Sequence, residues 1–260
     1  MKINNSDLAL CRSALYEALA LGFRSPTQET ICRLISAEHN QALTEIATIL
    51  DEIRVGKRPA RLTYQIKNLK DCSDVHTLSA LEKSYRIYFG HTAQAKVPPY
   101  ETEYGEETLF QQPQQLGDIA GFYHAFGLNL NPNEHERVDH ISCECEFLAF
   151  LTRKEAYAIE QNDQTMLQET RRAQKLFLRD HLARFAPSFS NLLIHENQDG
   201  FYNVLAKLAN DFILTECACF DIVPGPEQLR LRPRALVDEC FTCGSGEELI
   251  TKINEASSKL

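Results

Sequence analysis

One short loop combines residue types that bind cations. Residues 98–107 have the sequence PPYETEYGEE and place four carboxylates and two tyrosines within ten positions. Carboxylates bind guanidinium groups through two parallel hydrogen bonds, and tyrosine rings offer faces on which arginine stacks. This composition is typical of a receptor for an arginine-bearing peptide, and a solvated surface loop would fit it equally well.

A second polar group precedes the most apolar segment of the chain. A helix beginning at residue 137 would carry polar and aromatic side chains together on one half of its surface. His140 and Glu144 would lie one turn apart, so we expect the carboxylate to raise the imidazole pKa. The group is interpreted either as the rim of a groove that holds a cationic or amide-rich segment, or as a helix N-terminus stabilised by Asp139. The side chains on that half are Asp139, His140, Cys143, Glu144, Phe147 and Phe150.

Cysteines offer a third kind of chemistry. Cys240 and Cys243 have the CxxC spacing that lets two thiolates share a metal ion or form a redox pair. A structural zinc site takes four ligands, however, and the chain has no second CxxC. These two residues are therefore weak metal candidates, and we expect no resident cofactor. No nucleophile with its base and no phosphate-binding loop stands out, so we do not expect an enzyme.

Overall composition narrows the class of protein. Of the residues, 43% are hydrophobic and 24% are charged, as in an ordinary soluble domain. The formal net charge of −9 disfavours nucleic-acid binding, because nucleic-acid-binding proteins present clustered positive charge. The longest apolar runs, such as FLAFL at 147–151, are far shorter than the roughly 20 residues of a membrane span. The N-terminus lacks the apolar core and cleavage site of a secretory signal, so we expect a cytoplasmic protein.

Helical periodicity runs along the whole chain, without sustained two-residue alternation. We therefore predict an all-α protein, with a single globular bundle-like domain of about ten helices over 1–224 and a tail over 225–260 packed on it. Prolines and glycines interrupt the period at 90–107, where we expect a loop, and Pro187 is expected to end a helix. Helices are predicted at 6–23, 27–36, 39–54, 60–70, 75–89, 113–127, 137–160, 163–185, 188–195, 200–220 and 247–258.

Several of these segments carry motifs of a known family. The most specific is the run LGDIAGFYHAFGL at 116–128, and the acidic loop adds PYETEYG at 99–105. ERVDH at 136–140 has valine where the family has proline, and Phe185 stands where tryptophan is common. Through these motifs, spread over roughly residues 10–220, the chain resembles the TorD/DmsD/NarJ family of cytoplasmic redox-enzyme maturation chaperones.

The resemblance implies a function for the polar segments. Members of the family bind the twin-arginine signal peptide and the apo catalytic subunit of a molybdopterin oxidoreductase, assist cofactor insertion and prevent premature export. We expect a monomer, with a domain-swapped dimer as the alternative. The residues expected to bind the partner are Tyr100, Glu101 and Glu103 near its arginines, Asp139, His140 and Glu144 as a polar anchor, and Tyr85, Phe89 and Phe122 as apolar contacts.

Two other functions compete with this one. A metal or iron–sulfur assembly factor built around Cys240 and Cys243 predicts bound metal in protein purified under reducing conditions. A stable accessory subunit of a membrane oxidoreductase would share the fold but predicts a permanent complex.

Overall fold

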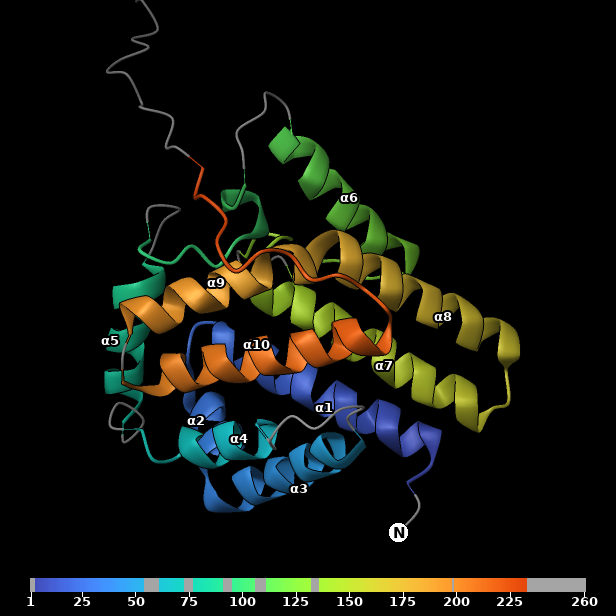
Figure 1. Ribbon diagram of the computed structural model, residues 1–260, viewed down its shortest axis with the longest axis horizontal. Coiled ribbons are helices and arrows are strands. Elements are labelled where there is room, and N and C mark those ends of the chain that lie inside the picture. The colour runs from blue at the N-terminus through green and yellow to red at the C-terminus, as the bar shows by residue number, and fades with distance from the viewer. Residues whose placement is uncertain are drawn as a thin grey trace, which may run out of the picture.

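The computed structural model describes residues 3–53, 61–72, 77–90, 95–105, 111–131, 136–197 and 199–232. Within these ranges the secondary structure is helical, apart from two isolated β-bridges, and the predicted all-α class is confirmed. The α-helices (Figure 1) are α1 (Asn5–Phe23), α2 (Gln28–Ile35), α3 (Ala37–Ile53), α4 (Leu62–Leu69), α5 (Leu78–Phe89), α6 (Gln111–Ala125), α7 (Ile141–Glu160), α8 (Gln164–Phe177), α9 (Ala183–Glu196) and α10 (Phe201–Cys219). A 3₁₀ turn, η2 (Glu101–Glu103), and a π turn, η3 (Leu178–Leu182), complete them.

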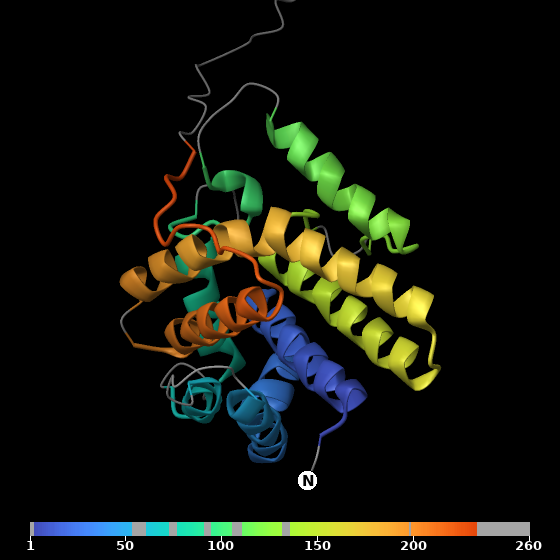
Figure 2. The same ribbon diagram turned by 45° about the vertical axis from the view of Figure 1, so that its right-hand side comes forward.

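The helices pack in pairs around α1. Helix α1 lies along α7, α7 lies along α8, and α9 lies along α10, while α2, α3 and α4 form a group at one end of the molecule. Helix α6 lies at the opposite edge, beyond α8, in both Figure 1 and Figure 2. The polar segments predicted from the sequence lie between these two ends.

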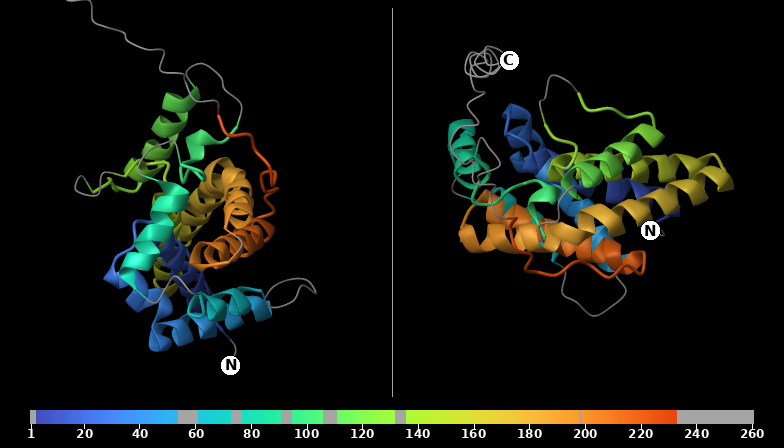
Figure 3. Two further views of the ribbon diagram at one scale, coloured as in Figure 1. Left: turned by 90° about the vertical axis from the view of Figure 1, so that its left-hand side faces the viewer. Right: turned by 90° about the horizontal axis from the view of Figure 1, so that it is seen from above.

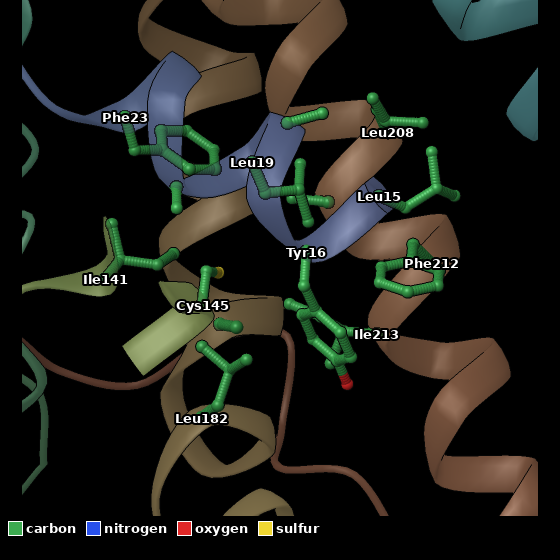
Figure 4. Close-up of a cluster of buried hydrophobic side chains, with 14 of the residues drawn as sticks. Leu15, Tyr16, Leu19, Phe23, Ile141, Cys145, Leu182, Leu208, Phe212 and Ile213 are labelled. Carbon is green, nitrogen blue, oxygen red and sulfur yellow. The ribbon is translucent and has the colours of Figure 1, made fainter. Parts of the chain in front are cut away.

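The apolar face of α1 forms the centre of the core. Leu15, Leu19 and Phe23 are fully buried. Figure 4 shows them in one cluster with side chains of α7 and α10, among them Cys145 and Phe212. Fully burying a leucine or phenylalanine side chain contributes about 1.5–3 kcal/mol. This packing fixes the position of α7, whose first turn carries part of the candidate site.

Helix α7 begins at Ile141, four residues later than predicted, so that part of the prediction is wrong. His140 is the N-cap, and its Nδ1 accepts a hydrogen bond from the backbone N–H two residues on at 3.1 Å. The preceding residue, Asp139, uses its carbonyl to accept from Glu101 N–H at 2.9 Å. The segment before Ile141 is not helical because it pairs with a distant loop, which local periodicity does not reveal.

The segment predicted as one helix at 163–185 consists of α8, the π turn η3 and the start of α9. Pro187 lies inside α9, so its predicted role as a helix end is wrong. Proline has no N–H and leaves the carbonyl of Ala183 without its helical partner. Gly225 N–H donates to that carbonyl at 2.9 Å. A hydrogen bond from another segment therefore lets the helix continue through the proline.

Gly225 belongs to a C-terminal strap, residues 222–232, which leaves α10 and runs back across α9 (Figures 1 and 3). A side chain does not fit at position 225, because an added Cβ would lie 2.0 Å from the Arg184 carbonyl oxygen. At its far end Leu231 forms an antiparallel bridge with Tyr104. The strap is thus seated on α9 and on the acidic loop.

Part of the predicted tail lies outside the described residues. This part is 233–260, with the predicted helix at 247–258 and both Cys240 and Cys243. The last two carboxylates of the acidic loop, Glu106 and Glu107, also lie outside them.

Candidate functional site

The two polar segments singled out by the sequence lie side by side. Tyr100 and His140 form an antiparallel bridge, and their rings meet edge to face with centroids 5.3 Å apart. The acidic loop is therefore held against the N-terminus of α7. We call residues 99–104 and 137–144 together the polar frame.

Arg137 neutralises the acidic loop from within the chain. Its guanidinium donates to both carboxylate oxygens of Asp139, at 3.0 and 2.8 Å, and to Glu103 at 3.2 Å. The same group lies over the Tyr100 ring, 4.4 Å from the centroid. Bidentate pairing and ring stacking are the interactions that the sequence suggested for an arginine of a partner. In this structure the chain's own arginine makes them.

Glu101 is fully buried and has two internal partners. Arg184 Nη2 donates to one carboxylate oxygen, and His181 Nδ1 lies 3.1 Å from the other. These partners are 83 and 80 positions away in the chain, on α9 and η3. Removing one partner of a buried ion pair costs roughly 3–5 kcal/mol. Glu101 therefore links the acidic loop to the α8–α9 segment.

Glu144 lies on the first turn of α7 and is fully buried. Burial raises the pKa of its carboxyl group well above the ordinary value, and the nearby carboxylates of Glu101 and Asp139 raise it further. The raised pKa favours the protonated, uncharged form of Glu144. Neither carboxyl oxygen of Glu144 has a hydrogen-bond partner among the described residues, and burial of an unpaired group disfavours an anion there.

His140 is neutral as well. Its pKa is lowered to about 3, because the imidazole is buried and because Arg137 lies close by. The sequence predicted a raised pKa from Glu144 one turn away. That prediction is wrong, because burial of the imidazole and the charge of Arg137 both lower its pKa. His140 instead serves as a neutral cap, with Nδ1 2.6 Å from Ser142 Oγ.

Tyr85 and Phe89 of α5 lie in an aromatic cluster beside the polar frame. Phe89 stacks on Phe189 with centroids 6.1 Å apart and meets Tyr202 edge to face at 5.1 Å. Only 3% of Phe89 is exposed, so it is part of the core. Tyr85 is partly buried, and its pKa is raised by burial and by the nearby Glu136 carboxylate. Tyr85 thus lies at the edge of the polar frame, and Phe89 packs against the Tyr85 ring from the core.

An open groove of about 670 Å³ lies between α6 and the η3–α9 junction. Of the residues predicted to bind a partner, Glu101 and Phe122 line it. It also presents two exposed carboxylates that the sequence did not single out, Asp118 and Asp180. Asp118 lies in the family motif at 116–128, whereas no local signal marked Asp180. The full lining is Glu101, Gln115, Gly117, Asp118, Gly121, Phe122, Ala125, Asp180, His181 and Arg184.

Two glycines of α6 border this groove, although packing within the protein does not require glycine at either position. An added Cβ at Gly117 or at Gly121 would meet no atom within 4 Å among the described residues. Glycine within a helix is destabilising by roughly 0.5–1 kcal/mol relative to alanine. Because the fold itself has room for a side chain at both positions, the backbone of α6 is open to close approach from outside.

A second cavity, of about 450 Å³, lies on another side of α7 and of the polar frame. It is lined by aromatic side chains and by charges of both signs, including Arg24, Arg153 and Glu146. The Cys143 thiol also lines it, and burial raises the pKa of that thiol to about 12. The thiol is therefore not a reactive nucleophile at neutral pH.

Two features are absent from the described part of the chain. There, no group of three or more histidine, cysteine, aspartate or glutamate side chains is placed to hold a metal ion. No helix in the same ranges is long and apolar enough to cross a membrane.

The fold and the groove together define an all-α protein with an open, carboxylate-lined surface groove beside a buried polar frame. The family described as nitrate reductase delta subunit matches residues 56–191, and the chain belongs to this family. It is 27% identical over 213 residues to the chaperone protein TorD of Vibrio cholerae serotype O1 (strain M66-2), covering 81% of this chain and 92% of the relative. It is 25% identical over 218 residues to the perchlorate reductase assembly chaperone protein of Dechloromonas aromatica (strain RCB), covering 81% and 90%.

Proposed function

We propose that this protein is a cytoplasmic maturation chaperone for a molybdopterin oxidoreductase. It binds the twin-arginine signal peptide and the apo catalytic subunit, assists cofactor insertion and prevents premature export. The observation that carries this proposal is the alignment with a TorD chaperone and with a perchlorate reductase assembly chaperone over at least nine-tenths of their lengths. No catalytic role is assigned to the protein.

The groove between α6 and η3–α9 is the proposed seat of the signal peptide. Asp118 and Asp180 are exposed on its two walls and can pair with arginine side chains. Asp180 is already paired with Arg179, both nitrogen–oxygen distances being 2.6 Å, but exposed pairs contribute little and exchange partners readily. Phe122 offers an aromatic surface in the same groove for the apolar part of the peptide.

The remaining predicted residues act, in this proposal, through the shape of the groove. Glu103, Asp139 and the ring of Tyr100 hold Arg137, and this cluster fixes the loop that carries Glu101. His140 caps the N-terminus of α7, and Glu144 is buried in the first turn of that helix. Tyr85 and Phe89 pack against each other at the edge of the polar frame. Because Glu103, Asp139 and Tyr100 already contact Arg137, and His140 and Glu144 are fully buried, the exposed carboxylates are the better candidates for direct contact.

The first test is titration calorimetry with the signal peptide of a molybdoenzyme encoded beside this protein. We expect binding that is lost, or strongly weakened, when both arginines of the peptide are replaced by lysine. The proposal requires this difference, because only guanidinium groups bind carboxylates bidentately. Equal binding of the two peptides would contradict it, and so would the absence of binding.

Charge-neutralising variants locate the site. Asp118→Asn and Asp180→Asn should each weaken peptide binding about two- to fivefold at low salt, the effect of one exposed ion pair of roughly 0.5–1 kcal/mol. Asp71→Asn is the matched control, because Asp71 is exposed and follows α4, far from α6 in Figure 1. If the control weakens binding as much as the groove variants do, the groove is not the binding site.

A further inference from the structure

The end of the strap is a short extended segment that pairs with the acidic loop. Arg232 N–H donates to the Glu103 carbonyl at 2.9 Å, and Gly105 N–H donates to the Arg230 carbonyl at 2.9 Å. These two bonds flank the bridge between Tyr104 and Leu231. We call residues 229–232 the arm. The arm thus adds an extended strand-like segment to the loop, as a bound peptide does when it extends the edge of a sheet.

The side chains of the arm match the chemistry expected of the partner. Its sequence is Leu-Arg-Leu-Arg, and the Arg232 guanidinium donates to Gln115 Oε1 at 3.0 Å. Gln115 is a lining residue of the groove. An arginine of the chain itself therefore lies at the edge of the groove in which we place the arginines of the signal peptide.

The two ends of the strap are held differently, and within the arm Leu229 N–H also donates to Ser188 Oγ of α9 at 2.8 Å. Gly225, at the other end, donates to Ala183 and fits tightly against the α9 backbone, so that end is an anchor. In the arm, by contrast, Arg232 Nε is buried and has no hydrogen-bond partner among the described residues. A buried donor without a partner carries a desolvation penalty that weakens the contact. Residues 226–228 between the two ends are exposed, and the Glu227 carbonyl accepts from Asn191 Nδ2 of α9 at 3.2 Å. The arm can therefore leave while the anchor stays if it gives up its own contacts, including the bond of Leu229 to Ser188.

We propose that the arm is an internal competitor for the arginine-bearing segment of the partner. It occupies the edge of the acidic loop and Gln115 in the free protein, and it is displaced when the partner binds. This inference rests on the proposed function. Displacement releases the Gly105 N–H, the Glu103 carbonyl and the Gln115 amide, which can then bind an extended peptide. A partner segment must therefore bind tightly enough to displace the arm.

Competition by the arm should weaken the affinity for the peptide by a measurable factor. A site that is open in only about one molecule in ten binds its ligand about tenfold more weakly than a fully open site. We therefore expect the full-length Arg232→Ser variant to bind the twin-arginine peptide up to about tenfold more tightly than the natural sequence. Arg172→Ser is the matched control, because Arg172 is exposed on α8 and the substitution changes the net charge equally. Its affinity for the peptide should be unchanged.

Hydrogen exchange follows the arm directly. In the free protein the Arg232 amide should be protected, and saturation with the twin-arginine peptide should make it exchange faster. The amides of Ile222 and Gly225 should remain protected in both states, because their acceptors, Cys217 and Ala183, lie in α10 and α9. An Arg232 amide that stays protected in the saturated complex, with no gain in affinity for Arg232→Ser, would overturn the proposal.

A second probe separates this proposal from the proposed function. The probe is a synthetic peptide with the sequence of residues 228–232, QLRLR. It should bind the full-length Arg230→Ser/Arg232→Ser double variant with millimolar affinity. It should bind the natural sequence more weakly, because the attached arm of the natural sequence competes at a high effective concentration. If this peptide binds but the twin-arginine peptide binds no form of the protein, the seat of the arm stands and the signal-peptide function fails. If QLRLR binds neither form, the arm has no competitive seat and the inference fails on its own.

Discussion

At the scale of single residues, the polar frame depends on the protonation states of two buried groups. Glu144 is held neutral because burial and the carboxylates around it raise its pKa. His140 is held neutral because burial and Arg137 lower its pKa to about 3. Both groups would otherwise add charge at the junction of the loop and α7. Their neutrality allows Arg137 and Arg184 to pair with Asp139 and Glu101 without further buried charge.

Glu144→Gln should make the protein more stable at alkaline pH. When folding raises the pKa of a carboxyl group, the folded state loses stability as pH rises from the pKa of the group in the unfolded chain to its pKa in the folded protein. Glutamine keeps the shape of the neutral acid and does not titrate, so its advantage should grow from pH 5 to pH 8. Urea unfolding at these two pH values measures it. Glu146→Gln, an exposed neighbour on α7, should show no such trend; a trend of equal size in both variants would refute the assignment.

His140→Asn should reduce the sensitivity of the fold to acid. The pKa of His140 is lowered from about 6.5 to about 3 on folding, so the stability it supports is complete above pH 6.5 and is lost as pH falls towards 3. One proton corresponds to a slope of about 1.4 kcal/mol per pH unit in that window. Asparagine is a good N-cap and does not titrate. Denaturant unfolding between pH 7 and pH 4.5 should give a shallower slope for this variant than for His124→Asn, whose histidine is exposed.

At the scale of secondary-structure elements, α6 and the α8–α9 segment define the groove in different ways. Helix α6 presents Gly117 and Gly121, which leave its backbone accessible. The α8–α9 segment contains a π turn and Pro187, and the strap completes its hydrogen bonding through Gly225. The α6 wall of the groove is thus open to a ligand, whereas the α8–α9 wall depends on a hydrogen bond from the strap.

Gly117→Ala and Gly121→Ala test whether the open wall is used. Each substitution should stabilise the protein by roughly 0.5–1 kcal/mol, because alanine is the better helix former and a Cβ has room at both positions. Each should also weaken binding of the signal peptide if the peptide approaches the backbone closely. Thermal unfolding and titration calorimetry measure the two effects. Gly105→Ala is the contrasting variant, because its φ of +116° should make it destabilising. Added stability with unchanged peptide affinity would place the peptide elsewhere.

At the scale of the whole molecule, one buried ionic network joins four helices. Arg12 of α1 donates to Glu155 of α7 at 2.8 Å and to Glu216 of α10 at 2.7 Å, and to Gln174 of α8 at 2.8 Å. Burial opposes the charge of Arg12, but Glu216 and Glu155 outweigh it and the arginine pKa is raised. The network fixes how α1 and α10 sit against α7, and so fixes the helices that carry the site.

Arg12→Ala should therefore destabilise the whole fold. Removing one member of a buried network leaves uncompensated charge and costs roughly 3–5 kcal/mol. Arg24→Ala is the comparison, because the pair of Arg24 with Glu29 is largely exposed and such pairs are worth about 0–1 kcal/mol. Guanidinium unfolding of the two variants measures the difference. A loss of stability for Arg12→Ala no larger than that for Arg24→Ala would show that the network does not hold the helices together.

The all-α class, most of the helices and the segments that meet at the site could be predicted from the sequence. These features are local: apolar spacing sets a helical face, and the runs at 116–128 and 136–140 are family motifs whatever they contact. Helices α1 and α10, which carry continuous apolar spacing, were predicted within about two residues of their ends.

Which charged groups pair, and which acids and bases are neutral, could not be predicted from the sequence, because both depend on packing. Glu101 pairs with Arg184, which lies 83 positions away, and Gly225 N–H binds the Ala183 carbonyl that Pro187 leaves without its helical partner. No local sequence pattern contains either of these two contacts. The protonation of Glu144 depends on burial and on neighbouring carboxylates, which exist only after packing. A chain encodes its helices through neighbours in sequence, whereas electrostatic pairing and desolvation depend on neighbours in space.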